Sequence, residues 1–342
     1  MINLRNDYCA IAHEKVLEAL VNNSKNTFVG YGLDEYTNNV EKIIRKLTNN
    51  TEAIVSILPG GTVTNKAMIG HLLRPYEAVI CADTAHINVH ETGAIESDGH
   101  KVIGTKGING KIQVSEIKKV IDTHLDEHMV KPKMVYISHP TELGSVYSLD
   151  ELKEISKICK ENDLYLYVDG ARLATALTSK HTEITLEDLG SLVDAFYIGG
   201  TKNGLLNGEA LVVNNKDIQN ELRYSVKHFG GMYSKGFVAG IQFETLLKDG
   251  LIFEIGKKQN ELAEYLVEEL KKLNIDFMIE CESNQIFPIF TKKQIEYLKK
   301  YIMFEMWEDR REKGVIRFVT HFMLTKEEVF ETIQIIKDSL LK

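Results

Sequence analysis

Two residues that could act together in catalysis each follow a short apolar run. Asp169 ends the run LYLYVD, and Lys202 follows AFYIGGT. Ligands of open α/β sheets collect at the carboxyl ends of the strands, so both side chains are expected at one site. A lysine whose pKa is lowered by desolvation is a nucleophilic amine that forms an imine with an aldehyde. Taken singly, Asp169 could pair with Arg172 or cap a helix, and Lys202 could extend into solvent.

The segment LPGGTVTN, residues 58–65, combines the end of a strand, a glycine-rich turn and the start of a helix. Free N–H groups at such a helix start, here Gly61 and Thr62, can bind a phosphate together with the Thr62 hydroxyl. The turn is weak evidence alone, because Gly-Gly turns before helices are common. A phosphate-binding turn, a carboxylate and a lysine, in that order, match what pyridoxal 5'-phosphate (PLP) needs: a phosphate site, a partner for its protonated ring nitrogen and a Schiff-base amine.

His86 follows another predicted strand, VICAD. Its imidazole could stack on the pyridine ring and transfer protons. Without the neighbouring motifs, a buried histidine with satisfied hydrogen bonds would be the favoured interpretation. His90 and Glu91 lie one helical turn further on and either support the site or face solvent.

The elements that must position these residues alternate along the chain. Seven short apolar runs predict strands, at 53–58, 78–81, 101–104, 134–138, 165–168, 195–199 and 210–213. Amphipathic periodicity predicts helices at 13–23, 36–49, 64–73, 114–126, 149–162 and 215–228. Runs such as MVYIS are apolar on both faces, as expected of strands covered by helices on each side. The pattern predicts an α/β fold with a mainly parallel, seven-stranded sheet.

From about residue 250 the pattern changes. A charge-rich amphipathic helix at 256–273 precedes short strands at 276–279 and 286–289, the apolar block VIRFVTHF and a closing helix at 325–341. We therefore predict a large domain over residues 1–248, which includes an N-terminal segment at 1–30, and a smaller α+β domain over 249–342. No linker of low complexity separates them, so the two domains are expected to share an interface.

Composition argues against several classes of protein. The chain has 342 residues and a formal net charge of -8, with lysines interleaved among glutamates, so nucleic acid is not expected as a partner. The four cysteines are far apart and form no CxxC pair, so no metal site is predicted. We find no signal-peptide core and no run of about 20 apolar residues. A cytoplasmic enzyme that does not bind membranes is therefore expected.

With these residues in place, the chain resembles the threonine aldolase family. This family is the aldolase-like branch of the β-eliminating lyases, within the fold type I, aspartate-aminotransferase-like PLP enzymes. The resemblance covers nearly the whole chain in family order: INLRNDY, VGYGLDEYTNNV, LPGGTVTN, DTAHINVHETGA, TELGSVYSL, VDGARL, GGTKNG, HFGGMYSKG, SNQIFP and VIRFVTHF. It implies the fold type I architecture and a homodimer or homotetramer whose subunits share active sites.

The resemblance also implies roles for single residues of the cofactor site. Lys202 would carry PLP as a Schiff base, Asp169 would pair with the ring nitrogen, and His86 would stack on the ring. The backbone at Gly61 and Thr62 would bind the phosphate. These implied roles coincide with the chemistry argued above from residue type and position.

A second group of residues is implied to contact the substrate. Arg172 and Arg317 resemble the pair that orients the cofactor hydroxyl and binds the substrate carboxylate, for which an arginine fork is geometrically suited. For Arg317 alone, a salt bridge between domains is the alternative. Asn6 stands where the best-known members have serine, and it could still donate to the carboxylate. Glu142 stands where many members have a second active-site histidine.

The implied reaction is retro-aldol cleavage of a β-hydroxy-α-amino acid, typically threonine or allo-threonine, to glycine and an aldehyde. A base removes the β-hydroxyl proton, and the pyridinium ring that Asp169 stabilises accepts the electron pair from Cα–Cβ cleavage. As that base we favour a water molecule held between His86 and Glu142. Two alternatives stay open: a PLP-dependent β-eliminating amino-acid lyase, which uses the same residues, and a PLP-binding relative with little turnover.

Overall fold

The central sheet contains all seven predicted strands. The structure, a computed structural model, describes residues 1–341. The strands lie side by side in the order β2 (Ile54–Leu58), β8 (Glu209–Val213), β7 (Ala195–Gly199), β6 (Tyr165–Asp169), β5 (Lys131–Ser138), β3 (Glu77–Ala82) and β4 (Lys101–Thr105). β8 runs antiparallel to both of its neighbours, and the other pairings are parallel. The prediction of a mainly parallel α/β sheet is therefore confirmed.

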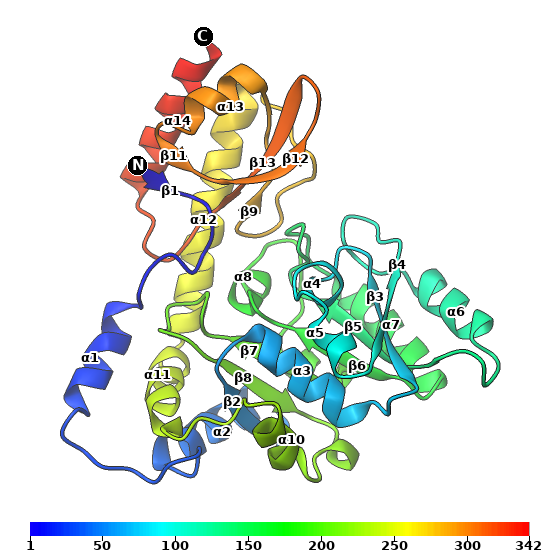
Figure 1. Cartoon of the computed structure of the whole chain (residues 1–342). Coiled ribbons are helices and arrows are strands. Elements are labelled where there is room, and N and C mark those ends of the chain that lie inside the picture. Colours follow the sequence, from blue (N-terminus) through cyan, green and yellow to red (C-terminus); the bar gives the residue numbers. More distant parts are fainter. Residues whose placement is uncertain (342) are drawn as a thin grey trace.

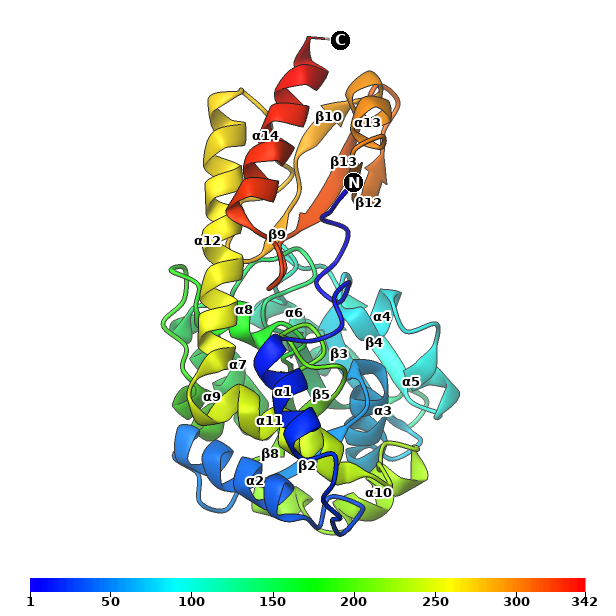
Figure 2. The same cartoon turned by 90° about the vertical axis from the view of Figure 1, so that its left-hand side faces the viewer.

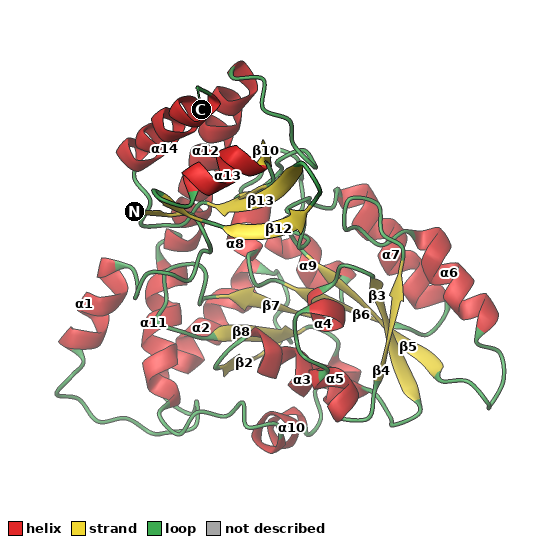
Figure 3. Cartoon of the chain, turned by 45° about the horizontal axis from the view of Figure 1, so that its top comes forward, coloured by secondary structure: helices red, strands yellow, loops and turns green. Residues whose placement is uncertain are grey.

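Helices pack on both faces of this sheet (Figure 3), because successive strand residues point to opposite sides. One face buries a cluster that includes Tyr136, Tyr167 and Tyr197. The helices that contribute to this cluster are α3 (Gly61–Leu72), α4 (His86–Val89), α5 (Ala94–Ser97) and α10 (Leu222–His228). Helices that contribute to the cluster on the opposite face are α1 (Glu14–Asn22), α2 (Glu35–Leu47), α6 (Val114–Thr123), α7 (Leu149–Glu161), α8 (Leu173–Leu177), α9 (Leu186–Leu192) and α11 (Gly236–Lys248).

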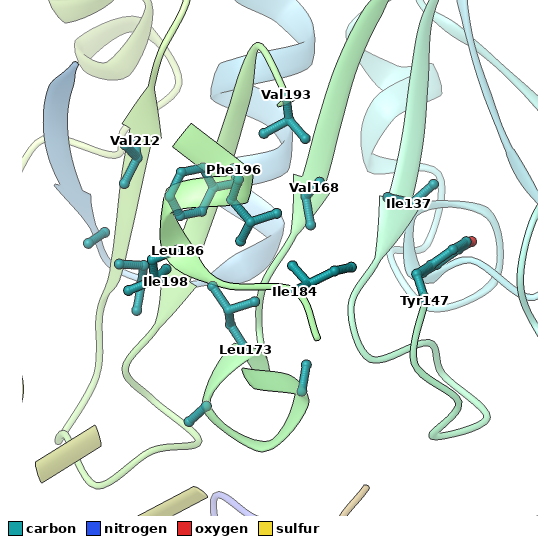
Figure 4. Packing of buried hydrophobic residues seen from close by; sticks show 14 of the residues in the cluster. Ile137, Tyr147, Val168, Leu173, Ile184, Leu186, Val193, Phe196, Ile198 and Val212 are labelled. Carbon is teal, nitrogen blue, oxygen red and sulfur yellow. The ribbon is translucent and has the colours of Figure 1, made fainter. Parts of the chain in front are cut away.

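The hydrophobic cluster on the face opposite Tyr136, Tyr167 and Tyr197 fixes the direction of the strand-end side chains. Figure 4 shows Val168, Phe196 and Ile198 among its members, and all three are buried. Burying each of them contributes about 1.5–3 kcal/mol. Asp169 follows Val168 and so points to the tyrosine face, because a slip of one residue would turn the whole apolar set of the strand to the wrong side. The hydrophobic core thereby aims the candidate catalytic carboxylate.

Helix α12 (Leu251–Lys272) connects the two parts of the molecule (Figures 1 and 2). At its start, Leu251 and Ile255 belong to the cluster of the large domain, whereas Leu262 and Leu270 belong to a third cluster. The elements around that third cluster are β9 (Gln285–Ile286), β10 (Ile289–Thr291), α13 (Lys292–Leu298), β11 (Ile302–Met303), β12 (Glu305–Asp309), β13 (Lys313–Val319) and α14 (Lys326–Leu340). The boundary at residues 248 and 249 stays a prediction, since one helix contributes to both clusters.

The N-terminal residues belong to the same small-domain core. Strand β1 (Ile2–Asn3) pairs in parallel with β11, and Ile2 and Leu4 are buried in the third cluster. The chain then runs down to α1, which packs beside α11 on the large domain (Figure 1). The segment between β1 and α1 therefore passes the junction of the two parts.

Four predicted elements differ from the structure. The strand predicted at 286–289 is divided into β9 and β10, with Phe287 and Pro288 between them. The helix predicted at 215–228 is broken into a short 3-10 helix, η1 (Lys216–Ile218), and α10, because Asn215 caps the first and Glu221 adopts a left-handed φ of 60°. The strand predicted at 276–279 is reduced to one bridge between Phe277 and Pro288. Helix α12 begins at Leu251, earlier than the predicted residue 256.

Several helices were not predicted: the short helices α4, α5, α8, α9 and α13, and the longer helix α11. The last of these has a clear physical reason. Its sequence, GFVAGIQFETLLK, is apolar on nearly all sides and buries eight of its 13 residues, so it shows little of the periodicity on which the prediction depends. Among residues 1–341, no helix combines the length and the apolar character that crossing a membrane requires.

Candidate active site

Asp169 lies at the carboxyl end of β6, where four donors surround its carboxylate. The Tyr197 hydroxyl and the Ala171 N–H (3.0 Å) donate to Oδ1. The Tyr136 hydroxyl and Asn65 Nδ2 (3.1 Å) donate to Oδ2. Burial alone raises the pKa of this carboxyl, but His86 and the hydrogen bonds from the two tyrosines outweigh it, so the pKa lies below its usual value. The site therefore holds a buried carboxylate in its ionised form.

His86 begins helix α4, and a buried carboxylate holds its ring. The Nδ1 atom lies 2.8 Å from Glu91 Oε1, which also accepts a hydrogen bond from Asn65 Nδ2 at 2.8 Å. Glu91 is buried, so the interpretation in which it faces solvent is wrong. An ionised carboxylate can accept hydrogen bonds but cannot donate them. The contact therefore assigns the ring proton to Nδ1 and leaves Nε2 available as an acceptor. Asn65 links this pair to Asp169.

Glu142 follows β5 in a loop beside His86. Its Oε1 accepts hydrogen bonds from the Ser138 hydroxyl (2.6 Å) and the His86 backbone N–H (2.8 Å). Burial raises the pKa of this carboxyl above 4.5, and the hydrogen bond from Ser138 lowers it only in part. Glu142 is thus a buried carboxyl group that follows the carboxyl end of β5 and is hydrogen-bonded to the start of α4.

Lys202 follows β7, and its amine lies 6.0 Å from the centre of the Tyr8 ring. No side chain or carbonyl in residues 1–341 accepts a hydrogen bond from this amine. Burial, followed by the charge of Arg172, lowers the pKa of Lys202 below its ordinary value. Nearby, burial raises the pKa of Glu209 to about 7, while its Oε2 accepts from the Gly200 N–H at 3.0 Å. The amine is therefore poised to react as a nucleophile.

Arg172 grips Asp7, a residue of the N-terminal segment. Its Nε and Nη2 donate to Asp7 Oδ2 (2.6 Å) and Oδ1 (3.1 Å), and Asn284 Nδ2 donates to Asp7 Oδ2 at 3.0 Å. The two-pronged contact occupies two of the arginine's three nitrogens. Asn6 precedes Asp7 in the chain, and the Oδ1 atom of Asn6 accepts a hydrogen bond from the Tyr8 N–H at 3.2 Å. The fork expected to bind a substrate carboxylate is thus largely engaged within the protein.

Arg317 lies on β13 and is less engaged. Its Nε is buried and has no hydrogen-bond partner within residues 1–341, and its guanidinium carbon lies 5.3 Å from the centre of the Trp307 ring. Burial and then the charge of Arg172 lower the pKa of Arg317, but a guanidinium stays protonated in proteins. No salt bridge across the domains involves this side chain among the described residues. Among the described residues, Arg317 is therefore the arginine of the site that has no ion-pair partner.

The glycine-rich turn lies directly against the Asp169 pocket. Helix α3 begins at Gly61, so the N–H groups of Gly61 and Thr62 are those that a helix start leaves without intrahelical partners. A side chain at position 61 would come within 3.1 Å of the Tyr197 hydroxyl, the same group that donates to Asp169. The absence of a side chain at Gly61 lets the turn pack onto the tyrosine.

Several site residues were missed from sequence. Tyr136, Tyr197 and Asn65 around the Asp169 carboxylate, and Asp7 opposite Arg172, were not predicted. One signal was present: Tyr136 lies in the predicted strand MVYIS, and Tyr197 in AFYIGG. Side chains two apart on a strand share a face, so a tyrosine near a strand end is a candidate partner for a strand-end carboxylate. Residue type and spacing give no such signal for Asp7, although it lies in the block INLRNDY that carries the family resemblance.

The arrangement of sheet, turn, carboxylate and lysine defines a class of protein. The solved aspartate aminotransferase of Thermotoga maritima matches the chain with a TM-score of 0.75 and 17% identity, over 100% of this chain and 92% of that one. The class is therefore that of fold type I, aspartate-aminotransferase-like architecture, as predicted.

Sequence relatives then specify the family. The family model described as Beta-eliminating lyase matches residues 3–292. The low specificity L-threonine aldolase of Pseudomonas sp. (strain NCIMB 10558) is 33% identical over 275 residues, which are 79% of this chain and 78% of the relative. The solved threonine aldolase of Leishmania major has a TM-score of 0.98 and 38% identity, over 99% of both chains. The chain belongs to the beta-eliminating lyase family, and the predicted resemblance to threonine aldolases is confirmed.

Proposed function

We propose that the chain is a PLP-dependent aldehyde-lyase that cleaves a β-hydroxy-α-amino acid, threonine or allo-threonine, to glycine and an aldehyde. The observation that carries the proposal is the ionised Asp169 carboxylate in its pocket of donors, close to a lysine of lowered pKa. The relatives support this reaction over the alternatives, because the two Pseudomonas proteins at 32–33% identity are both named low specificity L-threonine aldolase.

The residues present fit PLP. A buried carboxylate suits a cationic ring nitrogen, a free amine suits an aldehyde, and the start of α3 suits a phosphate. A buried polar atom without a protein partner, Thr84 Oγ1, lies between β3 and His86 and adds a hydrogen-bonding group. When bound, PLP supplies a protonated pyridine ring that accepts the electron pair of the broken Cα–Cβ bond.

The side chains divide the remaining work. Lys202 would bind the cofactor aldehyde covalently, and Asp169 would keep the ring nitrogen protonated. His86, whose orientation Glu91 fixes, would lie against the ring with Nε2 facing the substrate. Arg317 would bind the substrate carboxylate through its free edge. Arg172, Asn6 and the backbone of Gly61 and Thr62 would orient the cofactor hydroxyl, the carboxylate and the phosphate.

The base that removes the β-hydroxyl proton is assigned to Glu142, which acts through a water molecule shared with His86. Glu142 is held by the Ser138 hydroxyl and the His86 backbone, so only its Oε2 is free of protein donors. Its raised pKa brings the carboxyl closer to neutrality, where a general base works best.

An assay of the purified enzyme tests the proposed reaction. With threonine, we expect acetaldehyde and glycine in equal amounts, measured by coupled aldehyde reduction and amino-acid analysis. Serine, cysteine and tryptophan should release little ammonia. Ammonia and a keto acid as the main products would instead establish the β-eliminating lyase. A yellow protein that is inert toward a panel of β-hydroxy amino acids would establish a relative with little turnover.

Replacing Glu142 tests the assigned base. Because a general base must be ionised, the raised pKa of Glu142 predicts an acid limb in the pH profile of kcat at a pH above 4.5, with activity rising as the pH rises through that pKa. Glu142→Gln should lower kcat by about 10²–10³-fold and abolish this limb. Steady-state kinetics between pH 4.5 and 9 measure both effects.

Ser138→Ala provides the matched control for this prediction. It removes the hydrogen bond that lowers the Glu142 pKa, so the pKa should rise and the acid limb should move to higher pH, while most of kcat at high pH is kept. If Glu142→Gln retains kcat and the acid limb, the base lies elsewhere.

We also propose that the enzyme is a cytoplasmic homodimer or homotetramer with shared active sites. Support comes from exposed apolar side chains on and near the N-terminal segment, including Ile11, Val21, Val29 and Leu33, each more than half exposed. Apolar surface of this kind marks sites of association. Light scattering that gives the mass of one 38.8 kDa chain would contradict an oligomer.

A further inference from the structure

Trp307, the one tryptophan of the chain, lies on β12 of the small domain. Its ring centre is 5.3 Å from the Arg317 guanidinium carbon and 6.4 Å from the centre of the His90 ring. His90 ends α4, and its ring centre is 5.6 Å from that of His86. Trp307 thus lies against Arg317 on one side and against His90, at the end of α4, on another.

A β-bulge aims this indole. Strands β12 and β13 pair Met306 with Ile316 and then Glu308 with Val315, so Trp307 is the extra residue of β12 that has no partner. Bulges bend a strand and redirect a side chain, and they are frequent next to active sites. Without the bulge, alternation along β12 would assign Trp307 a regular cross-strand partner and a fixed face of the small sheet.

The indole is held on a second side by the small-domain core. Phe287 is 1% exposed and packs edge-on against it, with ring centres 5.1 Å apart and an interplanar angle of 70°. Edge-to-face pairs are a favoured aromatic geometry. Trp307 therefore offers Arg317 an aromatic surface that is packed against the small-domain core.

The contact leaves Arg317 suited to bind an anion. A guanidinium attracted to an aromatic face keeps its planar edge, and hence its N–H donors, free for a carboxylate. Here the Nε is buried and has no partner among residues 1–341, while the other arginine of the site is engaged by Asp7. A flexible arginine without the indole would lose side-chain entropy each time it bound substrate.

We propose that Trp307 is a positioning residue for the substrate carboxylate: the bulge in β12 turns its indole onto Arg317 and holds the guanidinium edge toward the site. The inference rests on the proposed function only in taking an amino acid as the ligand. It assigns no chemical step to Trp307. Loss of the indole should weaken binding of every amino acid to a similar degree and leave the cleavage step nearly intact, because the carboxylate contact is made before and during the reaction.

The test compares Trp307→Leu and Trp307→Phe in the PLP-loaded enzyme. Glycine affinity is measured from the change in visible absorbance of the cofactor, a readout that does not depend on cleavage. We expect Trp307→Leu to weaken glycine binding about tenfold and to raise the KM for threonine to the same extent, with kcat within about threefold. Trp307→Phe keeps an aromatic face and should recover most of the affinity. Tyr265→Leu, an exposed aromatic change on α12, should alter either constant by less than about twofold.

Each outcome decides the proposal. Glycine affinity within twofold of wild type in Trp307→Leu overturns it, as does a loss of kcat with unchanged KM. A Trp307→Phe variant no better than Trp307→Leu also overturns it, because then shape and not the aromatic face matters. Circular dichroism and retained cofactor absorbance establish that both variants are folded and loaded. If wild type binds glycine but does not cleave threonine, the proposed function fails while this test still stands.

Discussion

Lys202→Ala should abolish threonine cleavage and the visible absorbance of the cofactor together. The amine is the group proposed to bind the cofactor aldehyde, and it has no hydrogen-bond acceptor in residues 1–341 that would give it a structural role instead. We expect kcat to fall on the order of 10⁴-fold, because the nucleophile that binds the cofactor covalently is lost. Absorbance spectra after dialysis and steady-state assays measure the two effects.

Borohydride reduction of the wild-type enzyme followed by peptide mapping checks the same assignment without mutation. The pyridoxyl group should be found on Lys202. Label on any other lysine, or no label at all, would refute the core of the site. Lys160→Ala, a matched change of an exposed lysine on α7, should leave labelling and kcat unchanged.

The second large effect is expected from Asp169→Asn. The amide keeps the shape of the side chain but removes its negative charge. In the wild-type protein four donors stabilise that charge, and the pKa of the Asp169 carboxyl lies below its usual value. Without that charge the ring nitrogen would not stay protonated, and we expect kcat to fall about 10²–10³-fold, the range for loss of one electrostatic contact in an active site.

Cofactor content separates this outcome from a loss of binding. The Asp169→Asn variant should still be labelled by borohydride at Lys202, because the covalent contact does not involve Asp169. Asp150→Asn, an exposed change at the start of α7, is the control and should keep full kcat. An Asp169→Asn enzyme with kcat within a few fold of wild type would show that the carboxylate does not support catalysis.

The sheet and the central residues of the site could be predicted because both depend on local signals. Each strand of the large domain is a short apolar run between polar turns, and burial on two faces leaves little else that such a run can form. Asp169, Lys202 and the turn at Gly61 stand at the ends of these runs. Their proximity then follows from the parallel arrangement of the strands.

The remaining features depend on contacts between distant segments. Asp7 reaches Arg172 only because the N-terminal segment crosses the junction of the domains, and Trp307 reaches Arg317 only through a bulge whose position is set by strand pairing. Neither produces a periodic pattern in the sequence. The α11 helix shows the opposite limit, since burial on nearly every side removes the polar face by which a helix is recognised.

The pairing of β1 with β11 has a consequence for how the molecule is made. Ile2 is synthesised long before its partner Ile302, so the small-domain core cannot be completed until Ile302 has left the ribosome. Closing so long a loop costs little extra free energy, about 0.6 kcal/mol for each doubling of length, but contacts of this range slow folding. Asp7 lies shortly after β1 in the sequence. The partner of Arg172 therefore arrives among the last parts of the fold, and a nascent chain has no complete site.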